Sequence, residues 1–153
     1  SFLILLIKKE DFVIANEFIE RLNINQNDFI LTNCKSEEIG AFLNAADVGV
    51  SLRHNHIMNT TTPSGKILEY LGSGLPVITT KGMGEISNIV EEKGFGVVLD
   101  NMDNDDEIIE KIMPFLQHND DFRIGISNWA NLNISTDAKI TDYVQLLKKL
   151  LSH

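Results

Sequence analysis

The sequence has few basic residues, a single cysteine and no long apolar run, and each shortage excludes a class of protein. Its 13 Lys and Arg residues against 22 Asp and Glu residues give a formal net charge of −9. Because affinity for phosphate backbones comes mainly from clustered Lys and Arg, this balance argues against DNA or RNA as a partner. Cys34 alone forms no internal disulfide and no Cys-x-x-Cys motif, which suits a reducing compartment. We therefore predict a cytoplasmic protein.

Membrane spans are also lacking from the sequence. The apolar run at residues 2–7 is far too short to cross a bilayer, and it lacks the basic region and cleavage site of a signal peptide. We predict no transmembrane segment, and membrane contact only as peripheral contact at the inner face, through a longer protein. Because the chain opens on Ser1 and enters this run at once, we expect it to be a domain of such a longer protein.

Several common catalytic motifs are missing. The chain has no Gly-x-Ser-x-Gly elbow, no Walker A motif and no Gly-x-Gly-x-x-Gly sequence, which removes the standard hydrolase, P-loop and dinucleotide classes. His54 and His56 lie two residues apart, but no Cys or acid stands at a recognisable metal-ligand spacing from them. We predict that these histidines are exposed and that the chain has no metal site.

What the sequence does contain is an alternation of short apolar runs and longer helical stretches. The apolar runs, at residues 2–7, 29–32, 48–52, 76–80 and 96–99, are nearly continuous in Val, Ile and Leu, as in parallel strands buried on both faces. Helical stretches lie at residues 11–22, 37–46, 64–71 and 85–93, and then at 105–118, 120–131 and 137–151. We predict one α/β domain over residues 1–153: a Rossmann-like, doubly wound parallel sheet of about five strands within 1–100, and a helical tail over 101–153.

Ligands of such sheets bind at the carboxyl ends of the strands, where loops lead into helices. The loop after residues 48–52 is unusually long, and Thr62 followed by Pro63 predicts a helix start close to it. A helix N-terminus binds phosphate, while Gly65 allows close backbone approach and Lys66 adds a positive charge. The sequence thus predicts an anion site here.

Glu69 follows Lys66 by three residues and falls on the same helix face, opposite an apolar stripe. A carboxylate beside bound phosphate can accept two hydrogen bonds from a vicinal diol such as ribose. An ion pair between Glu69 and Lys66 at the surface is equally compatible with this spacing. In the next loop Gly82 and Gly84 free the backbone before Glu85, as plain turn residues or as ligand contacts.

Three stretches together resemble a known family: AADVGVSL at residues 45–52, PSGKILEYLGSGLPVITT at 63–80 and GMGEISNIVEEKGFGVVL at 82–99. Their order and spacing are similar to the carboxyl-terminal, nucleotide-sugar-binding domain of retaining glycosyltransferases with the GT-B fold, the glycosyltransferase group 1 type. The resemblance runs from Ser36 to Asp100. Its most specific piece is Lys-x-x-Glu-Tyr-Leu-x-x-Gly-x-Pro-Val-Ile at residues 66–78.

The resemblance implies transfer of a hexose from a UDP-, GDP- or ADP-sugar to a glycan or lipid-linked acceptor, as in polysaccharide biosynthesis, with no cofactor and no obligatory metal. It implies that Glu69 binds the ribose hydroxyls and that Lys66 stabilises the leaving diphosphate. The further donor contacts that it implies are Ser64 and Gly65 at the diphosphate, and Gly82, Gly84 and Glu85 near the sugar and phosphates. Arg53 follows Ser-Leu as in a subgroup and is placed to reach the same pocket, although an exposed loop Arg fits equally well.

The chain also departs from the family. Thr61 stands where many members carry a second Glu, eight residues before the ribose-binding one, and Pro63 stands three rather than two residues before Lys66. The family's first β-α unit, with an Arg and a Lys for the diphosphate, and its acceptor domain would both precede Ser1. We therefore expect this chain to hold a donor without catalysing transfer alone.

Two other functions are compatible with this β-α order. One is half of a nucleotide-sugar epimerase, which has the same fold and needs acid and base residues from both domains. The other is a non-catalytic module such as a response-regulator receiver. A receiver needs an Asp at the end of its third strand, whereas Asp47 precedes that strand, so this second alternative fits the sequence less well.

Overall fold

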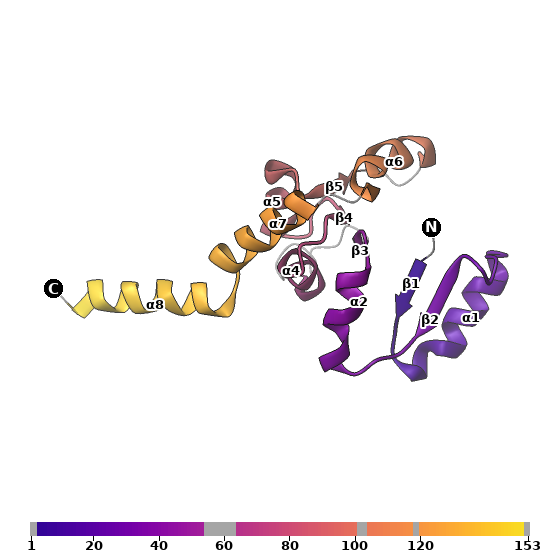
Figure 1. Ribbon diagram of the computed structural model, residues 1–153, viewed down its shortest axis with the longest axis horizontal. Helices are drawn as coiled ribbons and strands as arrows, with labels where there is room; N and C mark the ends of the chain where they lie inside the picture. Colours follow the sequence, from indigo (N-terminus) through magenta and orange to yellow (C-terminus); the bar gives the residue numbers. More distant parts are fainter. Residues whose placement is uncertain (1–2, 54–63, 101–103, 118–119, 152–153) are drawn as a thin grey trace. The chain divides into compact units, whose positions relative to one another are not determined.

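The structure is a computed structural model that describes residues 3–53, 64–100, 104–117 and 120–151 (Figure 1). The chain divides into two compact units, Ser1–Gly40 and Ala41–His153, and each is described by itself. The single domain over residues 1–153 stays a prediction. The α/β class is confirmed, because parallel strands alternate with helices along the chain.

The first unit is a β-α-β element. Strand β1 (Leu3–Leu6) pairs in parallel with β2 (Phe29–Thr32), Leu3 lying opposite Phe29, and helix α1 (Phe12–Arg21) connects the two strands. Short 3-10 turns at Lys9–Asp11 and Ser36–Glu38 precede α1 and the next helix. No residue of β1 or β2 is buried in the first unit taken by itself, so the prediction that these two strands are buried on both faces stays a prediction.

The second unit contains a parallel sheet of three strands. Helix α2 (Ile39–Ala45) spans the boundary between the two units and leads into β3 (Gly49–Ser51). After β3 follow α4 (Gly65–Gly72), β4 (Val77–Thr80), α5 (Glu85–Lys93) and β5 (Gly96–Leu99). The strand order is β3-β4-β5, with Gly49 opposite Val77 and Thr80 opposite Leu99. The five predicted strands are therefore all present among the described residues, but they form sheets of two and three strands.

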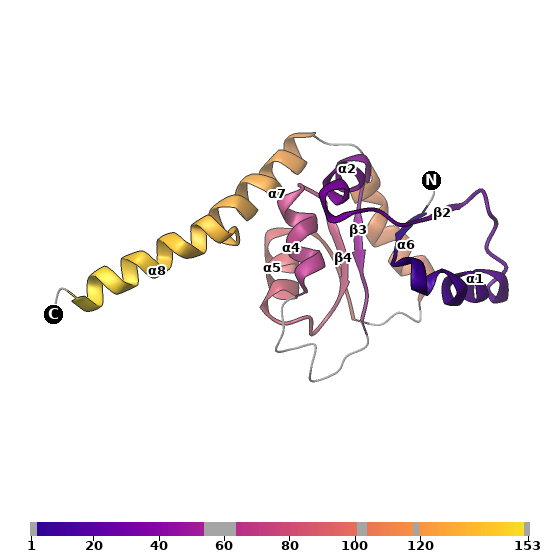
Figure 2. The same ribbon diagram turned by 90° about the horizontal axis from the view of Figure 1, so that it is seen from below.

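Helices cover both faces of the three-stranded sheet. On one face Val77 packs with buried residues of α4, α5 and α7 (Asp120–Asn133), and Figure 2 shows these three helices together beside β4. On the other face Ile78 packs with residues of α6 (Asp105–Ile112) and the 3-10 turn Met113–Leu116. β4 is buried throughout. This double cover is the defining feature of the predicted doubly wound fold.

The helices that follow β5 confirm the predicted helical tail. Two of its members differ in their packing: α7 contributes the buried Ile126 and Ala130 to the core, whereas α8 (Thr136–Leu151) exposes its apolar residues, among them Ile140, Tyr143 and Leu147. Of the helices in the described ranges, none combines the length and the apolar character that crossing a membrane requires.

Candidate functional site

Strands β3, β4 and β5 run in parallel, so they all end at one edge of the sheet, here called the carboxyl edge. β3 ends at Ser51, β4 at Thr80 and β5 at Leu99. Arg53 follows β3 by two residues, and Lys81 and Asp100 directly follow β4 and β5. Ligands of open parallel sheets bind at such an edge, beside the loops that leave it.

The start of α4 lies at this carboxyl edge. Ser64 is its N-cap residue with φ −72° and ψ 110°, and intrahelical bonding begins with the Ile67 N–H, which donates to the Ser64 carbonyl oxygen at 3.0 Å. The Ser64 Oγ makes no cap bond but lies 3.4 Å from the Ser51 Oγ at the end of β3. The N–H groups of Gly65 and Lys66 belong to the first turn, where a helix has no acceptor of its own to offer.

The predicted helix start is slightly early, because the first helical residue is Gly65. Thr62 and Pro63, expected at the N-cap and at the first helical position, lie outside the described residues, as do Thr61, His54 and His56. The prediction that the two histidines are exposed and bind no metal therefore stays a prediction. The same holds for Thr61 at the position where many family members carry a second Glu.

Helix α4 has the predicted two faces. Ile67 and Leu71 are fully buried in the core, whereas Lys66 and Glu69 are exposed. Among the ion pairs between described residues, none joins Lys66 to Glu69, so the surface ion pair that the spacing allowed is not formed. Both charged groups are thus open to solvent on the outer face of the helix that starts at the carboxyl edge.

Tyr70 fixes α4 against β3. Its ring covers Gly49 so closely that a Cβ at Gly49 would overlap it, and its hydroxyl donates to the Val50 carbonyl oxygen at 3.3 Å. Burial, and to a lesser extent the negative charge of Glu69, raise the pKa of the Tyr70 hydroxyl above 10.0. The residue that follows Glu69 on α4 is therefore anchored to the sheet.

We expect this environment to be visible in a titration followed by tyrosinate absorbance. A component that Tyr70→Phe removes titrates above pH 10.0, and Glu69→Gln lowers its pKa only in part because burial is the larger cause. A raised folded pKa favours the neutral phenol, so its contribution to stability is complete below the unfolded pKa and is lost as pH rises through the folded one. A Tyr70 component that titrates below pH 10.0 would contradict this assignment.

The loop between β4 and α5 is a tight glycine turn. Gly82 and Gly84 have φ values of 82° and 68°, a region that residues with a side chain rarely adopt. Met83 between them is buried, and the Ser87 Oγ donates to the Gly84 carbonyl oxygen at 2.9 Å. Glu85 is exposed as the first residue of α5. The plain turn function of both glycines is confirmed, and contact with a ligand stays a prediction.

The carboxyl edge also contains an ion pair that was not predicted from the sequence. The Lys81 Nζ lies 3.1 Å from Asp100 Oδ1, and the hydrogen bond to Asp100, followed by its charge, raises the pKa of the exposed Lys81. Lys81 and Asp100 directly follow Thr80 and Leu99, which lie opposite each other in the β4–β5 pair. Once this register is known, the two charged residues are expected to be neighbours. This pair links the start of the glycine turn to the end of β5.

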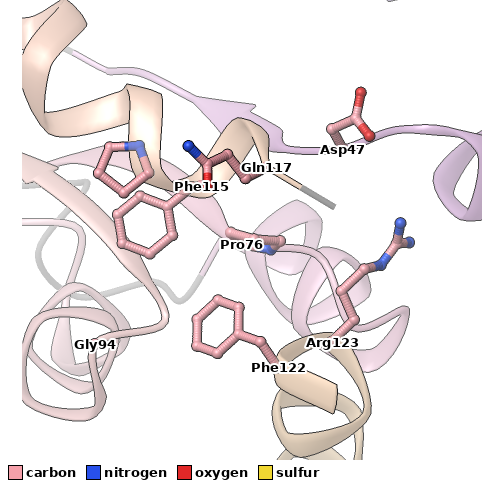
Figure 3. Close-up of a pocket in the computed structure, with 8 residues that line it drawn as sticks. Asp47, Pro76, Gly94, Phe115, Gln117, Phe122 and Arg123 are labelled. Carbon is pink, nitrogen blue, oxygen red and sulfur yellow. The ribbon is translucent and has the colours of Figure 1, made fainter. Parts of the chain in front are cut away.

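A cavity of about 250 Å³ lies at the opposite edge of the sheet (Figure 3). Its lining includes residues that precede the strands, Asp47, Pro76 and Gly94, together with Phe115, Phe122, Pro114, Gln117 and Arg123. The Arg123 guanidinium donates to the Ala46 carbonyl oxygen at 3.1 Å. None of the predicted donor-binding residues lines this cavity, so the candidate site and the cavity are separate features of the second unit.

The predicted residues lie on three segments that leave the carboxyl edge. Ser64 is the N-cap of α4, which carries Gly65, Lys66 and Glu69; the glycine turn holds Gly82 and Gly84 and leads to Glu85; and Arg53 follows β3. The sequence model of the family described as glycosyl transferases group 1 matches residues 8–128, which include all of these positions. A search of curated proteins finds no match to the chain. The family match favours a glycosyltransferase over the epimerase and receiver alternatives.

Proposed function

Because the chain belongs to the glycosyl transferases group 1 family, we propose that it binds the nucleoside diphosphate sugar of a glycosyltransferase reaction at the carboxyl edge. The observation that carries this proposal is the outer face of α4. Lys66 stands in its first turn, and Glu69 is exposed three residues later, about 4.5 Å further along the helix axis. The Lys66 ammonium and the N–H groups of the first turn suit a diphosphate, and the Glu69 carboxylate, further along the helix, suits the ribose beside that diphosphate.

Each part of the donor has a chemically matched partner in this proposal. The diphosphate lies at the N-terminus of α4, where the helix dipole, the N–H groups of Gly65 and Lys66, and the Lys66 ammonium favour negative charge. Glu69 accepts hydrogen bonds from the ribose hydroxyls. Gly82 and Gly84 let the second loop approach the sugar and phosphates without a side chain in between.

The same groups serve the transfer reaction. Negative charge grows on the diphosphate as its bond to the sugar breaks, and preorganised dipoles and cations aimed at that charge lower the barrier. This stabilisation proceeds through Lys66 and the α4 N-terminus and requires no metal. We propose further that this chain is the carboxyl-terminal half of a retaining GT-B enzyme, and that a glycan or lipid-linked acceptor is held by another domain. On that proposal the chain alone binds donor without transferring sugar.

Calorimetric titration of the 153-residue chain with UDP, GDP and ADP tests this function. We expect one of the three to bind, with inorganic pyrophosphate binding more weakly and the free nucleoside most weakly. Lys66→Ala is expected to weaken the nucleotide and pyrophosphate alike by about tenfold, since each loses one charge-assisted contact.

Lys93→Ala is the matched control, because it removes an exposed lysine from the far end of α5. It is expected to leave nucleotide affinity unchanged. The proposed function would be wrong if none of the three nucleotides bound, or if Lys93→Ala and Lys66→Ala weakened binding equally.

A further inference from the structure

The buried polar side chains of the described residues share one chemistry. All carry a hydroxyl, and they lie in the last residues of β3 and β4 or at the starts of α4 and α5: Ser51, Ser64, Thr79, Thr80 and Ser87. A buried hydroxyl is costly unless it is hydrogen-bonded, and each of these has a partner. Such groups therefore hold particular backbone segments in place.

Thr80 makes the most specific of these contacts. Its Oγ1 accepts a hydrogen bond from the Arg53 N–H at 3.1 Å and donates one to the Arg53 carbonyl oxygen at 2.8 Å. β3 has already ended at Ser51, so the hydroxyl continues the pairing of β4 with the chain beyond the last backbone pair. Both backbone groups of Arg53 are held by one side chain that is itself 7% exposed.

The neighbouring threonine has a different role. Thr79 Oγ1 donates to the Ser51 carbonyl oxygen at 3.0 Å, so it fixes the last residue of β3 itself. Thr80, in contrast, bonds to the residue that leaves the sheet toward the candidate site. A valine at position 80 has nearly the same shape and would suit a buried strand, but it would remove both bonds to Arg53.

We infer that Thr80 is a positioning residue of the nucleotide site: it fixes the Arg53 backbone at the carboxyl edge so that the Arg53 side chain is held ready for the diphosphate. This inference rests on the proposed function. Thr80 does not touch the nucleotide; it lowers the entropy that Arg53 would otherwise lose on binding. The expected signature is therefore a loss of affinity that depends on Arg53.

A double-mutant cycle on the nucleotide that the parent chain binds tests the inference. We expect Thr80→Val and Arg53→Ala each to weaken binding about tenfold, and the double variant to be no weaker than Arg53→Ala alone. Thr80→Ser keeps the oxygen and is expected to bind within about twofold of the parent. If Thr80→Val does not fold, the difference in nucleotide affinity between Thr80→Ala and Thr80→Ser measures the contribution of the hydroxyl.

Ser127→Ala is the matched control, since its Oγ donates to the Gly72 carbonyl oxygen at 3.0 Å, away from the carboxyl edge. It is expected to lower the urea midpoint without changing nucleotide affinity. The inference is overturned if Thr80→Val binds as the parent does, or if it weakens binding by the same factor with and without Arg53. If the parent binds no nucleotide, the proposed function fails and the inference fails with it. If the parent binds a nucleotide but Thr80→Val has no effect that depends on Arg53, only the inference fails.

Discussion

Glu69→Ala is expected to weaken nucleoside diphosphate binding by about 10- to 100-fold. The proposed ribose contact consists of hydrogen bonds to a charged acceptor, each worth about 1.5–3 kcal/mol, and about 1.4 kcal/mol corresponds to a factor of ten. The exposed carboxylate has no ion pair with another described residue, so its removal is expected to change the free energy of unfolding by less than about 0.5 kcal/mol. Calorimetry and urea denaturation measure the two effects separately.

The choice of ligands makes the Glu69 prediction specific to ribose. Inorganic pyrophosphate has no ribose and is expected to bind Glu69→Ala as it binds the parent. A 2′-deoxynucleotide is expected to bind the parent more weakly than its ribose counterpart does, whereas Glu69→Ala should bind the two alike. Glu110→Ala, which removes an exposed carboxylate from α6, serves as the control variant. Equal ribonucleotide affinities for the parent and Glu69→Ala would refute the proposed role.

The elements themselves were largely predictable from the sequence. The continuous apolar runs predicted all five described strands to within one residue at either end, as at residues 2–7, where β1 spans Leu3–Leu6. Helical periodicity likewise predicted that Glu69 faces away from Ile67 and Leu71. These features depend on local spacing, which the sequence shows directly. The division into sheets of two and three strands depends on long-range pairing, which periodicity does not report.

The positioning contacts of the candidate site were not predictable in the same way. Thr80 and Arg53 are 27 residues apart, and Lys81 and Asp100 are 19 residues apart, so neither pair forms a local motif. A threonine at the end of an apolar strand has high β propensity and gives no sign that its hydroxyl is buried. The sequence therefore predicted where the strands and the loops of the candidate site lie, while the side chains that fix those loops required the strand register.

Gly96→Ala is expected to destabilise the second unit more than any other substitution considered for this chain. Gly96 lies opposite Val77 in the β4–β5 pair. A Cβ at position 96 would overlap the Val77 carbonyl oxygen and would lie 2.6 Å from the Val77 backbone nitrogen. Its φ of 156° also lies in a region that residues with a side chain rarely adopt. Backbone strain and overpacking each cost about 1–3 kcal/mol, so a loss of about 3–5 kcal/mol in unfolding free energy is expected.

Urea denaturation of the parent and of Gly96→Ala measures this loss as a lower midpoint. Gly125→Ala is the matched control, because Gly125 lies inside α7 with no heavy atom within 4 Å of an added Cβ. That substitution is expected to stabilise the chain by about 0.5–1 kcal/mol through helix propensity. A Gly96→Ala variant as stable as the parent would mean that β4 and β5 do not pair in this register. Because Thr80 and Lys81 leave the sheet from the end of β4, the register that Gly96 permits also positions the residues proposed to hold the donor.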